Sequence, residues 1–200
     1  MTCVMHIYFV VDRSVCDSRA STTQIQSIQT STAEMLECFG EYLRRRCWRD
    51  GQLFDPSNAT LWLCSVDRAL LRQGWQDITF LDPASIVFVY LLVSAELDAE
   101  VSLLDVYDGG NLHALVLSCL YTAYSYMGHE TSYALKPFLL SSSSATKVQL
   151  AAERKAFWRR CLCIVGRSSS NMLRLNTDPT YFGHVFAQLK LYSPSDLRNK

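Results

Sequence analysis

Residues 111–128 read NLHALVLSCLYTAYSYMG, the clearest helical pattern in the chain. Its apolar side chains recur at i, i+3, i+4, i+7, i+8, i+11, i+12 and i+15, which is the spacing of one helix face. They are Leu112, Leu115, Val116, Cys119, Leu120, Ala123, Tyr124 and Met127. The pattern predicts an α-helix with one side in a core, and Gly128 directly after it is the predicted C-cap.

Three Asp-Pro pairs predict the starts of further helices, because Asp is a good N-cap and Pro suits the first helical position. They are Asp55-Pro56, Asp82-Pro83 and Asp178-Pro179, and each precedes an apolar segment of helical length. The segment after the first pair ends at Gly74. Residues 84–97, after the second pair, are apolar nearly all round, which indicates a central buried helix.

A capping box at Ser31 and Glu34 starts another predicted helix, in which each side chain binds a free backbone amide of the first turn. Apolar residues at helical spacing follow as far as Cys47. A cluster of arginines near its end is interpreted as a solvated helix end rather than a nucleic-acid contact, because no aromatic residues are interleaved with it. These arginines are Arg44, Arg45, Arg46 and Arg49.

A helix is also predicted from about Lys147 to Val165. The pair Gly109-Gly110 and the serine runs at 141–144 and 168–170 are predicted to be loops. No series of segments alternates polar and apolar residues between hairpin turns, as antiparallel strands would. The sequence therefore predicts an all-α fold, a compact bundle of about six helices.

The predicted organisation is a flexible leader over 1–30, a helical domain over 31–192 and a flexible tail over 193–200. The apolar run 1–11 is about half the length of a membrane span and lacks the basic start and cleavage site of a signal peptide. Thr2 stands where N-myristoylation needs Gly, so no lipid anchor is evident. We expect no transmembrane segment, and a cytoplasmic location with the nucleus as a second one.

Charge and cysteine content narrow the function. Lys plus Arg and Asp plus Glu both number 19, and this zero formal charge argues against a protein that coats nucleic acid or an anionic membrane. The eight Cys contain no C-x-x-C pair, and the four His are scattered. We therefore expect reduced thiols in an intracellular protein and no metal site.

Motifs for catalysis are missing as well. The sequence has no phosphate-binding loop, dinucleotide fingerprint, zinc-protease or serine-hydrolase motif, and no kinase catalytic loop. Five carboxylates are interpreted as a solvated acidic edge, namely Glu96, Asp98, Glu100, Asp105 and Asp108. We expect no catalytic residue and no cofactor in a protein that acts by contact, and a small-molecule enzyme is the disfavoured alternative.

Several long runs of this sequence match one known family in the same order. They are Leu61-Trp62-Leu63, Ser65-Val66-Asp67-Arg68, Gln73-Gly74-Trp75-Gln76-Asp77, Ser125-Tyr126-Met127-Gly128, Leu135-Lys136-Pro137-Phe138-Leu139, Ala156-Phe157-Trp158 with Arg160-Cys161-Leu162, and Asp178-Pro179 with Tyr181-Phe182. Over about residues 31–192, the chain closely resembles the cyclin-dependent kinase 5 activator family, the neuronal cyclin-like activators.

This resemblance implies a cyclin-box-like kinase-activating domain, in agreement with the helix count. It implies a non-catalytic regulatory subunit that forms a heterodimer with a proline-directed Ser/Thr kinase like cyclin-dependent kinase 5. In the family, the helix pair of the cyclin box packs on the kinase helix that carries the Glu of the active ion pair, and a loop orders the activation loop. The alternative is a helical scaffold that binds a kinase or another partner without activating it.

Carried over to this chain, the supporting loop consists of Met127, Gly128, His129, Glu130 and Thr131. Gly128 would let the backbone approach closely. Glu130 would lie near the substrate groove and attract a basic residue downstream of the phosphorylated Ser or Thr. Thr131 stands where family members tend to have a larger apolar residue.

The resemblance also points to Trp158, Arg159 and Gly166 as partner-binding residues. Arg159 stands where the family typically has an Asp that contributes to kinase binding, and Gly166 stands where an Asn is expected. Exchanging an interfacial acid for a base can cost several kcal/mol if its partner is positive. The two departures therefore bear on kinase choice and affinity.

The edge of the 111–128 helix near Tyr124 and Met127 is its predicted partner-binding part. Tryptophans at helical spacing are more often core residues than interface anchors. We therefore interpret Trp62, Trp75 and Trp158 first as core, with an interface role as the competing interpretation.

Overall fold

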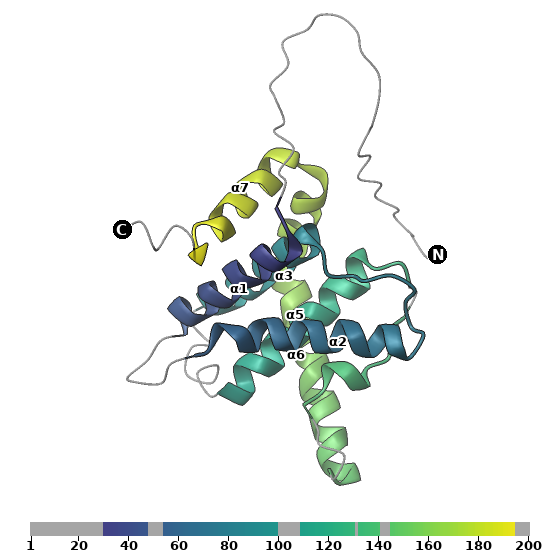
Figure 1. Cartoon of the computed structure of the whole chain (residues 1–200). Helices are drawn as coiled ribbons and strands as arrows, with labels where there is room; N and C mark the ends of the chain where they lie inside the picture. The colour runs from purple at the N-terminus through teal and green to yellow at the C-terminus, as the bar shows by residue number, and fades with distance from the viewer. Residues whose placement is uncertain (1–29, 48–53, 100–108, 131, 141–144, 195–200) are drawn as a thin grey trace, which may run out of the picture.

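The computed structural model describes residues 30–47, 54–99, 109–130, 132–140 and 145–194. These residues form six α-helices and one short 3-10 helix, and no strand occurs among them (Figure 1). The elements are α1 (Thr32–Arg46), α2 (Pro56–Arg72), α3 (Pro83–Asp98), α5 (Gly109–Met127), η2 (Lys136–Phe138), α6 (Lys147–Thr177) and α7 (Pro179–Lys190). The predicted all-α bundle of about six helices is confirmed.

The central element of the bundle is α3, which contacts α1, α5, α6 and α7. Every residue from Ser85 to Val93 is buried, so α3 has no solvent-facing side over two turns. Helix α2 packs on α1, and α6 runs through the middle of the molecule with its N-terminal end extending beyond the other helices (Figure 1). The predicted buried central helix is therefore confirmed.

All three Asp-Pro pairs begin helices as predicted. The Oδ1 atoms of the three Asp residues accept backbone hydrogen bonds from Ser57 at 2.9 Å, from Ser85 at 2.7 Å, and from Thr180 and Tyr181 at 3.0 and 3.2 Å. Each Pro occupies the first turn, where a backbone N–H would have no helical partner. These local signals fix the starts of α2, α3 and α7.

The cap of α1 is only half of the predicted capping box. The Ser31 hydroxyl accepts a hydrogen bond from the Glu34 amide at 3.1 Å, as expected. The Glu34 carboxylate, however, accepts a hydrogen bond from Lys190 of α7 instead of turning back to Ser31. A tertiary ion pair therefore replaces a local contact and joins the first helix to the last.

Helix α6 continues for 12 residues beyond the predicted end at Val165 and reaches Thr177. The serine run 168–170 therefore lies inside a helix, and its prediction as a loop is wrong. The buried face explains the difference, because its residues keep the helical period across the serines. They are Phe157, Cys161, Ile164, Ser168, Met172 and Leu175.

The prediction of a loop at Gly109-Gly110 is wrong, because both residues lie in the first turn of α5. Gly128 directly follows α5 as predicted, and its amide donates to the Tyr124 carbonyl at 2.8 Å, although its φ is not in the left-handed region. Among the described glycines, the left-handed conformation occurs at Gly74, with φ +69°, where α2 ends.

The arginines at the end of α1 form ion pairs and are not simply solvated. Arg44 and Arg45 both donate to the Glu41 carboxylate, at 2.7 and 2.9 Å. This pairing holds the pKa of Glu41 below its usual range. Arg46 reaches Asp98 at the end of α3. The cluster therefore serves to hold the C-terminal ends of α1 and α3 together.

The acidic edge predicted around residues 96–108 is wrong at its first residue. Glu96 is buried and forms an ion pair with Arg167, which joins α3 to α6. Several other predictions fall outside the described residues. They concern the leader up to residue 29, Arg49, Glu100, Asp105, Asp108, the loop 141–144 and the tail from residue 195.

None of the helices in the described ranges is both long and apolar enough to cross a bilayer. The six described cysteines are free thiols, and Cys38, Cys119 and Cys161 are buried among apolar side chains. Ser193, within the predicted tail 193–200, is buried just after the end of α7.

We predict that the free energy of unfolding falls as the pH rises above about 10. Burial raises the pKa of Tyr42, Tyr90 and Tyr124, and that of Tyr90 rises to about 12. A tyrosine in the unfolded chain has a pKa of about 10. Above that pH the unfolded chain releases protons that the folded chain still holds, and this difference favours unfolding. Denaturant titrations between neutral and alkaline pH, with tyrosinate absorbance, test this. Unchanged stability with all tyrosines ionised near the usual pH would contradict it.

Candidate functional site

The segment after α5 that the sequence singled out is fixed to the core by Tyr133. A Cβ atom at Gly128 would overlap the Tyr133 hydroxyl and the Tyr124 carbonyl oxygen, so this position has room only for glycine. The Glu130 amide donates to the same Tyr133 hydroxyl at 3.4 Å. This segment is therefore tied to the core at both Gly128 and Glu130. The close approach of a partner at Gly128 stays a prediction.

The predicted loop residues divide into an inner and an outer group. Met127 and Gly128 are partly buried, whereas His129 and Glu130 are exposed. Thr131 lies outside the described residues, so its packing stays a prediction. The polar residues His129 and Glu130 therefore face solvent, while Met127 and Gly128 pack partly against the core.

Tyr124 is completely buried, and its prediction as a residue that touches a partner is wrong. Its hydroxyl donates to Asp67 Oδ1 at 2.7 Å. Its ring stacks on Phe80 at a centroid distance of 3.9 Å and meets the ring of Tyr133 edge-on at 4.9 Å. The helical period of α5 could not separate the core side from the interface side. Tyr124 supports the loop from beneath.

Asp67 is the residue on which this support converges. Its Oδ1 accepts hydrogen bonds from Gln76 Nε2 at 2.7 Å, from the Phe80 amide at 3.0 Å and from the Tyr124 hydroxyl. The side chain is buried, so each of these bonds replaces a lost bond to water. One carboxylate thereby joins α2, the α2–α3 loop and α5.

Asp67 has no predicted role in the sequence patterns above, although the pattern of α2 carries a signal for it. Leu63, Val66 and Leu70 form the buried stripe of α2, and Asp67 lies on the same face at the i+4 position from Leu63. A charged residue on a core face requires partners, because burying an unpaired charge is costly. Asp67 is therefore identifiable from the pattern of α2 alone.

A second feature is an exposed apolar row on α6, which we call the α6 flank. Its residues are Trp158, Leu162, Val165 and Leu173, with exposed fractions between 43% and 73%. They recur at i, i+4, i+7 and i+15, beside the buried face of the same helix. Arg159 and Gly166 are exposed next to this row. Large apolar side chains gathered on one exposed face are typical of a protein-binding surface.

The three tryptophans that were expected in the core differ in how far they are exposed. Trp158 and Trp75 are exposed, at 44% and 41%, so for them the core interpretation is wrong. Trp62 is partly buried and stacks on His113 of α5 at a centroid distance of 4.2 Å. Tyr121 of α5 contacts the ring of Trp158 edge-on at 5.4 Å. The α6 flank is therefore connected to the helix that carries the supporting loop.

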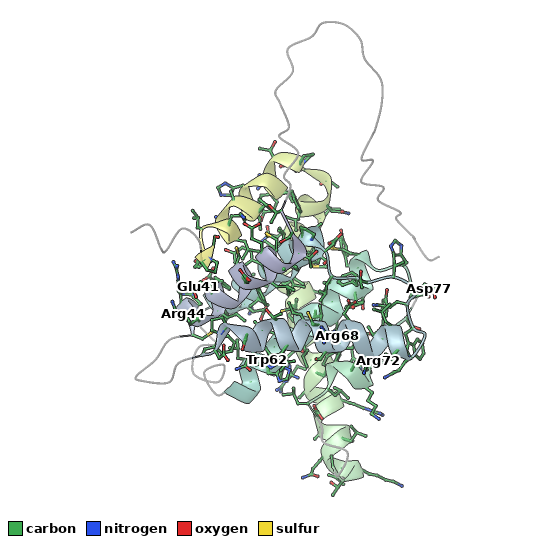
Figure 2. The ribbon with its side chains drawn as sticks, in the orientation of Figure 1. Glu41, Arg44, Trp62, Arg68, Arg72 and Asp77 are labelled. Carbon is green, nitrogen blue, oxygen red and sulfur yellow. The ribbon has the colours of Figure 1, made fainter. Side chains whose placement is uncertain are left out.

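The described surface carries charged side chains as well as apolar ones. Figure 2 shows Glu41 and Arg44 on α1, Arg68 and Arg72 along α2, and Asp77 beyond the end of α2. Within the described residues, no group of three or more His, Cys, Asp or Glu side chains is placed to hold a metal ion. Such an arrangement is suited to binding another protein.

The family match and the curated relatives of this chain carry the same description. Residues 5–195 match the family described as cyclin-dependent kinase 5 activator protein. Cyclin-dependent kinase 5 activator 1 of Bos taurus is 46% identical over 173 residues, which cover 86% of this chain and 51% of the relative. The Caenorhabditis elegans activator 1 is 42% identical over 186 residues, covering 92% and 48%. Activator 2 of Homo sapiens is 45% identical over 163 residues, covering 82% and 40%. The chain spans about half the length of the curated relatives it matches, or less.

Two glycine-to-alanine substitutions, one after α5 and one on α6, should change the free energy of unfolding in opposite directions. Gly128→Ala should lower the free energy of unfolding by about 1–3 kcal/mol, because the added methyl group overlaps Tyr133 and Tyr124. Gly166→Ala is the matched control, since no atom lies within 4 Å of the new Cβ and α6 gains a better helix former. It should raise stability by about 0.5–1 kcal/mol. Equal effects of the two substitutions in urea titrations would contradict the close packing at Gly128.

Proposed function

Because the chain belongs to the cyclin-dependent kinase 5 activator family, we propose that it is a non-catalytic regulatory subunit of a proline-directed Ser/Thr kinase like cyclin-dependent kinase 5. It binds the kinase as a heterodimer and activates it. The observation that carries this proposal is the α6 flank, four large apolar side chains exposed on one side of a helix. Such a surface is costly to leave in water and is covered by a partner.

The α6 flank is proposed to dock on the kinase helix that bears the Glu of the active ion pair. A kinase is active only when that pair is formed and its activation loop is ordered. A partner that binds this arrangement selectively shifts the equilibrium toward it. A shift from 1:99 to 99:1 takes about 5.5 kcal/mol of differential binding. A standard-sized interface with an aromatic anchor such as Trp158 can supply that amount.

The loop after α5 is proposed to order the activation loop. Gly128 and Tyr133 fix its base, so binding a kinase there requires little ordering of the loop itself. Met127 offers apolar contact, and the exposed carboxylate of Glu130 attracts a basic residue downstream of the phosphorylated Ser or Thr. For Thr131 we keep the contact role that the resemblance implies.

A second candidate function, motivated by Arg159, Gly166 and Thr131, is a scaffold that binds a kinase without activating it. Arg159 and Gly166 are exposed beside the α6 flank, and the resemblance implies other residues at all three positions. The double variant Arg159→Asp, Gly166→Asn separates the two functions. A wild-type protein that binds the kinase but stays silent, together with a double variant that activates it, would support the scaffold.

The proposed location is the cytoplasm, with the nucleus as a second one. The free thiols of the six described cysteines support a reducing compartment. Imaging of the tagged full chain in cells tests this location.

The direct test is to mix the protein with purified cyclin-dependent kinase 5, ATP and a Ser-Pro peptide. Phosphorylation should rise well above that of the kinase alone, because the bound subunit holds the active arrangement. The absence of any stimulation at micromolar protein would refute the proposed activation.

A matched pair of leucines tests the docking surface. Leu162 of the α6 flank and Leu191 after α7 are almost equally exposed, at 73% and 71%. Leu162→Asp should weaken kinase binding more than about tenfold, because it places a charge in an apolar interface. Leu191→Asp should leave binding unchanged. Calorimetry with the purified kinase measures both, and a similar loss in the two variants would place the interface elsewhere.

A further inference from the structure

A groove of about 800 Å³ lies between α1 and α2, away from the α6 flank and from the segment after α5, neither of which lines it. Figure 2 labels Glu41 and Arg68, which belong to the two helices that form its walls. The volume falls in the range of sites that enclose a ligand. Apolar residues of both helices line the groove together with a proline after α7, namely Ala33, Leu36, Pro56, Leu61, Cys64 and Pro194.

The groove is a fixed feature, because α1 and α2 are packed closely beside it. A Cβ atom at Gly40 of α1 would overlap the carbonyl oxygen of Pro56 at the start of α2, so the two backbones touch. Leu61 is nevertheless 60% exposed, and Cys64 is only partly buried. An exposed leucine on an apolar concave surface gains free energy when another apolar group covers it.

The same chain contains an apolar run that can supply this cover. Residues 1–11 lie outside the described residues and read MTCVMHIYFVV, with no Asp, Glu, Lys or Arg. The 18 residues 12–29 connect this run to residue 30, and Ala33 in the first turn of α1 already lines the groove. A connection of that length spans up to about 60 Å, so the run can reach the groove of its own chain.

The charges of the groove also fit this run. Glu37 on α1 and Arg68 on α2 line it, and neither forms an ion pair within the described residues. Because both signs are present, the groove does not select a strongly acidic or strongly basic partner. Asp12 is the first charged residue after the apolar run, and it can pair with Arg68 at one end of the groove.

We propose that the apolar run 1–11 binds in the groove between α1 and α2 of its own chain, with Asp12 paired to Arg68. The connection to α1 gives the run an effective concentration in the millimolar range, so weak apolar contacts are sufficient to keep the groove filled. The bound run covers Leu61 and Cys64 and removes its own apolar side chains from water. The α6 flank and the segment after α5 stay open, because they do not line the groove.

The first experiment measures how fast the Cys64 thiol of the full chain reacts with iodoacetamide, read by mass spectrometry of the peptides. The exposed thiol of Cys163 on α6 is the internal reference. The comparison is the triple variant Val4→Asp, Ile7→Asp, Phe9→Asp, in which the run is no longer apolar. Cys64 should react roughly tenfold more slowly in the wild type, because the tethered run covers it most of the time. This ratio of rates is the protection of Cys64.

Cys163 should react at the same rate in both proteins. Equal rates at Cys64, or a change that Cys163 shares, would overturn the proposal. Protection should also be the same at protein concentrations that differ tenfold, because the contact lies within one chain. Protection that grows with concentration would assign the groove to the run of a second copy and overturn the intramolecular contact.

A charge exchange tests the pairing of Asp12 with Arg68. Arg68→Asp should lower the protection of Cys64 by about threefold, because two acids then face each other, and the addition of Asp12→Arg should restore it. Protection is a ratio taken within each variant, so the direct effect of Arg68 on the pKa of Cys64 cancels.

Arg72→Asp is the matched control for this exchange. Arg72, also labelled in Figure 2, is an exposed base one turn further along α2 and does not line the groove. It should leave the protection of Cys64 unchanged. No recovery in the exchanged pair, or equal losses from Arg68→Asp and Arg72→Asp, would overturn the pairing. The experiments contain no kinase, so their results are independent of the proposed function.

Discussion

The buried carboxylate of Asp67 holds α2, the α2–α3 loop and α5 in one arrangement. A charge in the interior is tolerated only when hydrogen bonds replace its water, and Asp67 obtains three from donors on different segments. Two donors come from the α2–α3 loop, Gln76 and Phe80, and one comes from Tyr124 on α5. Because no single segment can satisfy the carboxylate, the three must be held in one arrangement. Polar bonds of this kind specify position more strictly than apolar packing does.

The same arrangement explains how an interior residue influences the surface. The ring of Tyr124 contacts Phe80 and Tyr133, and Tyr133 in turn fixes Gly128 and the amide of Glu130. Residues 127–130 are thus held as an extension of the core. A protein that orders a partner by contact needs this stiffness, because a surface that must itself be ordered uses up binding free energy. The α6 flank supplies apolar area, and the loop supplies a fixed shape.

The parts of the fold that were predictable from the sequence depend on local chemistry. The Asp-Pro starts of α2, α3 and α7 are decided within a few residues, and so is the apolar character of α3. The other features of the fold depend on contacts between segments distant in the sequence. Helix α6 passes through its serine run because residues beyond it are buried against other helices, and Glu34 leaves its local cap for Lys190. At the site, the position of Gly128 directly after α5 was predictable from the helical period. The burial of Tyr124 and the exposure of Trp75 and Trp158 were not predictable, because periodicity does not tell which partner covers a face.

A double-mutant cycle between Asp67 and Tyr124 tests most directly whether this carboxylate joins the helices. Asp67→Asn, Tyr124→Phe and the double variant are compared with the wild type by their free energies of unfolding. We predict a coupling of about 1–3 kcal/mol, the range expected for a hydrogen bond to a charged group. Additive effects, with a coupling near zero, would contradict it and show that α2 and α5 are held together by apolar packing alone.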